Sequence, residues 1–92
     1  MDKLVSNKNM WLRRTAMIHQ LGYKDKTDTN RLFNFALCLA HENEFFIQKS
    51  IGWALRDYAH YNDKLVIDFL KKRKSELSKL SYLEAAKHLI IN

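Results

Sequence analysis

Two cations and an indole recur about one helical turn apart near the middle of this chain. In a helix over residues 44–59, one face would carry these groups and a histidine just beyond the helix end: Lys49, Trp53, Arg56 and His60. Lysine and arginine neutralise phosphates, and a flat aromatic ring can lie against a nucleobase or a sugar. The spacing therefore predicts a basic, aromatic stripe suited to nucleic acid.

The opposite side of the same segment is apolar enough to hold it against a core. The residues expected there are Phe46, Ile47, Ile51, Ala54, Leu55 and Tyr58. One apolar side and one polar side are typical of a helix at the surface of a packed domain. We therefore expect this helix to be anchored by one side and to present the basic stripe on the other.

The composition indicates a small all-α domain. The chain has 92 residues, no proline and only two glycines, and 47% of its residues are hydrophobic. Because helix-breaking residues are so scarce, helices are expected throughout. A formal net charge of +6 favours a polyanionic partner. No apolar run is long enough to span a membrane and the polar start is not a signal peptide, so a cytoplasmic protein is expected.

Apolar periodicity predicts five helices. The first is expected to run through Trp11 to Leu21, and the second to follow Thr27 or Asp28 and run through Leu32 to Ala40. The third covers residues 44–59. The fourth follows Asn62, runs through Leu65 to Leu70 and ends in Lys71–Lys74, and the fifth runs from Tyr82 to about Ile90. The predicted N-terminal caps are Asn7 or Asn9, Thr27 or Asp28, Asn62, and a capping box at Ser81–Glu84. Gly22 is expected to close the first helix in a left-handed conformation.

Two of the helical segments resemble each other. Residues 10–23 can be laid over residues 46–59 with an offset of about 36 residues, which is typical of helix pairs that stack into a superhelix. Met1–Ser6 is too short to cover the first pair. We therefore expect the chain to be truncated on that side, or to be covered there by an N-terminal partner or by a second copy in a homodimer.

Three stretches of the chain resemble a known family. Residues 11–16 (WLRRTA), 45–58 (FFIQKSIGWALRDY) and 80–85 (LSYLEA) are similar, in order and spacing, to the C-terminal portion of the DNA alkylation repair enzymes of AlkD type. This family consists of DNA glycosylases that excise cationic alkylated purines such as 7-methylguanine and 3-methyladenine. The resemblance implies an all-α, HEAT-like repeat superhelix over residues 1–92. It also implies double-stranded DNA, especially alkylated DNA, as the partner, and a place at the bacterial nucleoid.

The resemblance also assigns roles to individual residues. Arg14 matches the family arginine that contacts DNA beside the lesion, and Trp53 matches one of two tryptophans that line the lesion's deoxyribose. Lys49 and Arg56 would be phosphate contacts on the same helix face as Trp53. The family's catalytic aspartate and its other tryptophan lie upstream of the matching region. These 92 residues alone are therefore expected to be poorly active or inactive.

Asp57 is the one candidate within the chain for a catalytic carboxylate. It lies one turn after Trp53, so the two share part of a helix face. A fixed carboxylate there could stabilise the oxocarbenium ion that develops on the sugar when the base departs. The alternative interpretation is an ion pair with Arg14 or Arg56, or a solvated carboxylate.

Several other residues are predicted to be structural. Trp11 is expected in the core, and Cys38, within an apolar run, is expected to be a buried and unreactive thiol. Arg13 could contact DNA or form a surface ion pair. The Lys71–Lys74 run is interpreted as the solvated end of a helix, with a nucleic-acid patch or a targeting signal as the alternative. The histidines are scattered, and the sequence predicts neither a metal site nor a cofactor.

Two other functions remain open at this stage. One is a DNA-binding module without catalysis, which would recognise duplex DNA through phosphates. The other is a helical-repeat module that binds a protein through an exposed apolar edge. DNA binding by cations falls steeply with salt, whereas association through apolar surface does not, so salt dependence distinguishes the two.

Overall fold

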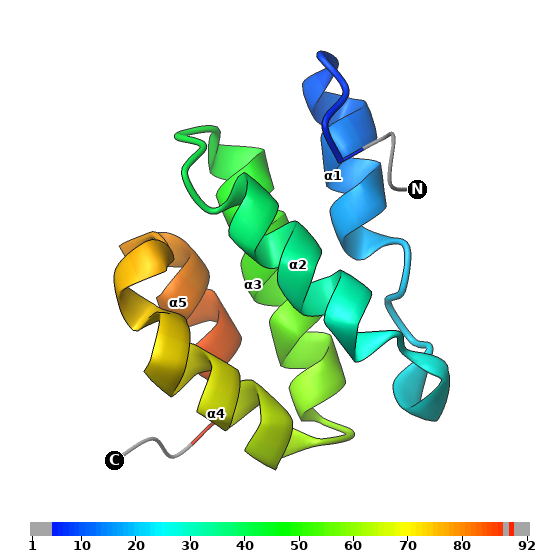
Figure 1. Ribbon diagram of the computed structural model, residues 1–92, viewed down its shortest axis with the longest axis vertical. Helices are drawn as coiled ribbons and strands as arrows, with labels where there is room; N and C mark the ends of the chain where they lie inside the picture. Colours follow the sequence, from blue (N-terminus) through cyan, green and yellow to red (C-terminus); the bar gives the residue numbers. More distant parts are fainter. Residues whose placement is uncertain (1–4, 88, 90–92) are drawn as a thin grey trace.

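The computed structural model describes residues 5–87 and 89, with the side chain of Asp25 excepted. Five α-helices follow one another along this part of the chain, and it contains no strand (Figure 1). They are α1 (Met10–Ile18), α2 (Thr29–Leu39), α3 (Phe45–Ala59), α4 (Asp63–Arg73) and α5 (Lys79–Ala86). Short 3-10 turns at Lys24–Lys26 and Lys74–Glu76 precede α2 and α5. The predicted all-α fold is confirmed.

Three of the helices begin at the predicted capping residues. The Asn9 side chain accepts hydrogen bonds from the backbone N–H groups of Trp11 and Leu12 at the start of α1. Asp28 caps α2 in the same way, and Asn62 caps α4. Each cap satisfies a backbone N–H that has no partner within its own helix, which is why these positions could be found from the sequence.

The first and last helices differ from their predicted extents. α1 ends at Ile18, and Gly22 lies beyond it in a turn, with a φ of +83°. The predicted capping box at Ser81–Glu84 is wrong, because Ser78 caps α5 and its Oγ accepts a hydrogen bond from the Ser81 N–H. Ser81 is buried instead and donates to the carbonyl of Gln48 on α3. The predicted end of α5 near Ile90 falls outside the described residues.

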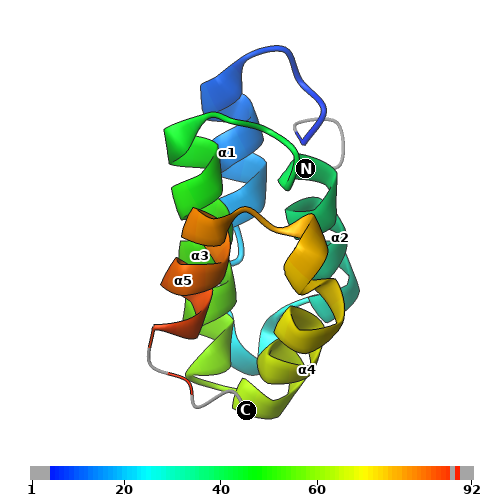
Figure 2. The same ribbon diagram turned by 90° about the vertical axis from the view of Figure 1, so that its left-hand side faces the viewer.

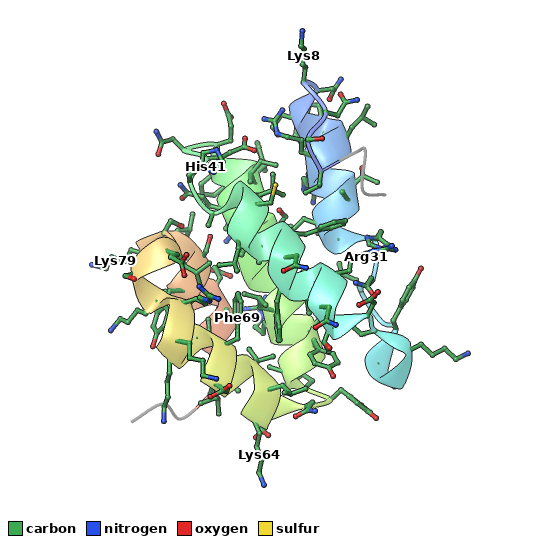
Figure 3. All side chains as sticks on the ribbon, viewed as in Figure 1. Lys8, Arg31, His41, Lys64, Phe69 and Lys79 are labelled. Carbon is green, nitrogen blue, oxygen red and sulfur yellow. The ribbon has the colours of Figure 1, made fainter. Side chains whose placement is uncertain are left out.

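The helices form two layers, as expected for stacked HEAT-like helix pairs. α1, α3 and α5 lie side by side in one layer, and α2 and α4 form the other (Figure 2). α3 is central, because each of the other four helices contacts it. Between α2 and α4, the ring of Phe33 stacks on that of Phe69, with centroids 4.3 Å apart. Phe69 is labelled in Figure 3. Successive helix pairs therefore share a continuous core.

The buried side of α3 agrees with its predicted apolar face, except at one end. Ile47, Ile51 and Leu55 are fully buried, and the other buried apolar residues of the helix are Ala54, Tyr58 and Ala59. Phe46, predicted on this side, is 44% exposed at the first turn of the helix. Its ring instead meets Trp11 of α1, with centroids 5.2 Å apart.

Two residues predicted to be buried are exposed. Trp11 is 54% exposed, because it lies in the first turn of α1 and its ring packs against Phe46, which is itself exposed at the start of α3. Cys38 is also exposed. Cys38 lies on the solvent side of α2. The buried residues of this helix recur at helical spacing and are Leu32, Phe35, Ala36 and Leu39. An apolar run alone does not say which of its members face the core.

Gly52 allows α3 and α5 to approach closely. A Cβ atom built at this position would overlap the Cβ of Glu84 and would lie 3.2 Å from the Ser81 carbonyl oxygen. The two helices are therefore in contact at the level of their backbones. This close approach also sets the position of Glu84 relative to the side chains of α3 on either side of Gly52.

No helix in the described part of the chain is long and apolar enough to cross a membrane.

Candidate nucleic-acid interface

Trp53 lies between two cations that come from different helices. The guanidinium carbon of Arg14, on α1, is 5.6 Å from the centroid of the indole. The ammonium of Lys49, one turn before Trp53 on α3, is also 5.6 Å from it. Both distances are within the range of a cation–π interaction. The indole is only partly buried, so its remaining surface is available to a ligand that tolerates two neighbouring positive charges.

The basic face, defined here as Arg14, Lys49, Trp53 and Arg56, lies opposite the buried side of α3. Ile47, Ile51 and Tyr58 point into the core, whereas the four members of the basic face are partly exposed. The three that α3 contributes were predicted to share one face, and the structure places them so. Packing of α1 against α3 adds Arg14 to them.

Arg14 has little freedom to move from this position. Its Nε is buried and has no hydrogen-bond partner among the described residues. The stem of the side chain is thus enclosed by protein while the guanidinium lies against the Trp53 ring. A buried donor without a partner is unfavourable. Arg13 Nε is buried without a partner in the same way, so the position of the Arg14 guanidinium against the Trp53 ring is the observation that connects Arg14 to this face.

Glu84 of α5 connects two of the cations. Its Oε1 lies 3.4 Å from Lys49 Nζ, and its Oε2 lies 3.6 Å from an Arg56 terminal nitrogen. This contact joins two cations predicted to bind phosphates to a residue predicted to lie in a capping box, and the sequence did not indicate it. No local pattern could have indicated it, because Glu84 is 35 residues from Lys49 and only the packing of α5 on α3 brings them together.

A hollow of about 430 Å³ lies beside the indole. Its lining residues are Leu21, Trp53, Arg56, Asp57 and His60. His60, predicted on the same face as Trp53, is therefore placed near it. Leu21 was predicted as the last residue of the first helix. It enters this site because α1 ends early and the turn after it folds back toward α3.

Asp57 is held by a backbone group. Its Oδ2 accepts a 2.8 Å hydrogen bond from the N–H of Gly22, in the turn that follows α1. The sequence left open a catalytic carboxylate, an ion pair with Arg14 or Arg56, and a solvated carboxylate, whereas the contact that the structure shows is this backbone hydrogen bond. Asp57 thus joins α3 to the turn after α1 and forms part of the wall of the hollow.

Arg13 has a structural role. Its NH1 donates to the carbonyl oxygens of Asn7 and Lys8, and its NH2 lies 2.8 Å from Glu42 Oε1. Both side chains of the ion pair are only 16% exposed. Of the two interpretations left open by the sequence, the structure favours the ion pair, which ties the segment before α1 to the turn after α2.

The Lys71–Lys74 run lies at the end of α4, where cations suit the carbonyl end of a helix. All four side chains are exposed. Lys72 pairs with Asp68, Arg73 pairs with Glu76, and the Lys74 ammonium lies over the Tyr82 ring. These contacts are typical of a solvated helix end. Among the described residues, no three His, Cys, Asp or Glu side chains are grouped closely enough to hold a metal ion.

The fold and the site together define a helical-repeat protein with a basic, aromatic face on one layer of its helices. Its sequence matches the family described as DNA alkylation repair enzymes over residues 1–89. The chain therefore belongs to the DNA alkylation repair enzyme family.

One solved structure shows the same similarity in three dimensions. It is described as a predicted DNA alkylation repair enzyme from Enterococcus faecalis, and it superposes with a TM-score of 0.88 and 37% sequence identity. The similarity covers 94% of this chain and 39% of that one, so the chain spans about two fifths of the length of this relative. A comparison with curated protein sequences finds no match.

Proposed function

We propose that this chain is the part of a DNA alkylation repair enzyme that holds duplex DNA, through its basic face. The whole enzyme would excise cationic alkylated purines such as 7-methylguanine and 3-methyladenine. The observation that carries the proposal is the position of the Trp53 indole, which lies between the cations of Arg14 and Lys49. An aromatic surface with phosphate-binding groups on both sides suits a nucleotide, whose sugar and base are flanked by phosphates.

Each member of the basic face has a proposed role. Trp53 lines the deoxyribose of the damaged nucleotide, and Arg14 contacts the DNA beside the lesion. Lys49 and Arg56 neutralise phosphates. The membership of the chain in the DNA alkylation repair enzyme family and its similarity to the Enterococcus faecalis protein support these roles.

Excision of the base requires a carboxylate at the sugar, and the two carboxylates near Trp53 both have other partners. A cationic methylated purine is already a good leaving group, so the developing charge to be stabilised is on the sugar. Two carboxylates of the described chain lie near Trp53, and both are engaged. Asp57 accepts from the Gly22 backbone, and Glu84 contacts Lys49 and Arg56. We therefore propose that the excising carboxylate is supplied by residues outside these 92.

A second candidate function is association with a protein. Trp11 and Phe45 are each 54% exposed, and Phe46 is 44% exposed. Their rings contact one another at the N-terminal ends of α1 and α3. Exposed aromatic clusters of this kind mark sites of protein contact in many proteins. An N-terminal partner or a second copy of the chain would be the occupant, and its binding would change little with salt.

Two substitutions separate the proposed roles on the basic face. Arg14→Ala is expected to weaken binding to undamaged and to 7-methylguanine-containing duplex alike, by about tenfold, because a charged contact is lost. Trp53→Ala is expected to weaken binding mainly to the damaged duplex. Fluorescence anisotropy with matched labelled duplexes measures the affinity of each variant for the undamaged and for the damaged duplex. Lys64→Ala is the control, since it removes an equal charge from an exposed position on α4, away from the basic face (Figure 3). Equal, negligible effects of the Arg14 and Trp53 substitutions would contradict the proposed site.

A further inference from the structure

Glu84 places a negative charge among the cations of the basic face. Each of its carboxylate oxygens faces a different cation, with Oε1 3.4 Å from Lys49 and Oε2 3.6 Å from Arg56. The side chains of Glu84, Lys49 and Arg56 are 19%, 24% and 25% exposed. A phosphate group that bridged these two cations would take the place of the carboxylate, because it too would direct separate oxygens at them.

The position of Glu84 follows from the backbone contact at Gly52. The Glu84 Cβ packs against the place where a side chain at position 52 would begin. Lys49 is three residues before Gly52 and Arg56 is four residues after it, so both side chains flank this contact on the same face of α3. Close approach of α5 thus directs the carboxylate between the two cations.

The contacts are loose enough to be exchanged. Tight charge-assisted hydrogen bonds between nitrogen and carboxylate oxygen are about 2.7–2.9 Å long, and both distances here exceed that range. All three side chains also keep some contact with solvent, so a phosphate can reach the cations from outside. DNA phosphate carries the same charge as the carboxylate and comes with many neighbouring phosphates, so it can displace Glu84 from the cations.

We propose that Glu84 occupies the phosphate-binding positions of Lys49 and Arg56 when DNA is absent, and so lowers the affinity of the basic face for undamaged duplex. Binding then requires the carboxylate to be exchanged for phosphate. The free energy needed to displace Glu84 is offset by contacts of Arg14 and Trp53 with a damaged nucleotide, which undamaged duplex does not make. Glu84 therefore acts as a specificity-determining residue. The inference rests on the proposed function, because it takes DNA as the ligand of the basic face.

Glu84→Gln tests the inference while keeping the size of the side chain. The matched control is Glu76→Gln, which makes the same change in charge at an exposed ion pair with Arg73, beyond the end of α4. Binding of undamaged duplex is measured by fluorescence anisotropy over a series of salt concentrations, and thermal unfolding checks that both variants are folded. Glu84→Gln is expected to tighten binding about fivefold at low salt and to steepen the salt slope by about 0.9, whereas Glu76→Gln changes the affinity less than about twofold.

The possible results separate the inference from the function on which it rests. Equal effects of the two variants, or weaker binding by Glu84→Gln, would overturn the inference; weaker binding would mean that Glu84 holds the cations in position for DNA. If the unmodified chain and both variants all fail to bind duplex DNA, the proposed function fails and the inference fails with it. Binding by the unmodified chain with no gain from Glu84→Gln overturns the inference alone.

Discussion

The 92-residue chain is expected to release 7-methylguanine from a defined duplex no faster than spontaneous depurination. Both carboxylates near Trp53 are engaged in other contacts, Asp57 with the Gly22 N–H and Glu84 with two cations. Without a fixed carboxylate at the sugar, the rate is expected to fall on the order of a hundredfold or more below that of a complete enzyme. Chromatographic analysis of released base, against a blank without protein, measures the rate.

Asp57 provides the control for this experiment. Release well above the blank would contradict the expectation and would mean that a carboxylate of this chain stabilises the sugar cation. Asp57→Asn should then abolish the release, because the amide keeps the shape of the side chain but carries no negative charge. Glu76→Gln, at an exposed position beyond α4, should leave it unchanged.

Gly52→Val is expected to destabilise the fold by about 3 kcal/mol, because new side-chain atoms must enter the backbone contact between α3 and α5. The nearest atoms are the Cβ of Glu84 and the backbone of Ser81 and Ala85, none of which is the far end of a flexible side chain. Small domains have net stabilities of only about 5–15 kcal/mol, so this loss is a large fraction of the total. Urea or thermal unfolding followed by circular dichroism measures it.

Asn34→Val is the matched control for the Gly52 substitution. Asn34 is exposed on α2, so valine there does not overlap with a neighbouring helix. The only expected loss of stability is the lower helix propensity of a β-branched residue. Its effect is expected to be about 0.5 kcal/mol or less. A Gly52→Val variant as stable as Asn34→Val would show that α5 can move away from α3 at little cost, which would contradict the close contact described here.

The features that could be predicted from the sequence are those determined by near neighbours. Asn9, Asp28 and Asn62 each cap a helix through a backbone group two or three residues away. The shared face of Lys49, Trp53 and Arg56 follows from helical periodicity in the same way. These relations hold whatever the rest of the chain does, so a pattern in the sequence is sufficient to find them.

The features that could not be predicted depend on which helix lies against which. Trp11 is apolar but exposed, because the ring that it meets on α3 is that of Phe46, in the exposed first turn. The contacts of Glu84 with Lys49 and Arg56, and of Asp57 with Gly22, join positions 28 to 35 residues apart. Arg14 was placed near the site by family resemblance alone, and only the packing of α1 on α3 shows that it lies against the Trp53 ring. Pairings of this kind have no local signature.

The salt dependence of duplex DNA binding tests the central claim most directly. The affinity of the unmodified chain for an undamaged labelled duplex is measured by fluorescence anisotropy between about 50 and 200 mM salt. Glu84 offsets one of the three cations of the basic face, so the unmodified chain is expected to give a slope of about −1.8 in the logarithm of affinity against the logarithm of salt concentration, since each neutralised phosphate contributes about 0.9. A slope near zero, or no binding at low salt, would contradict a DNA-binding role for this face.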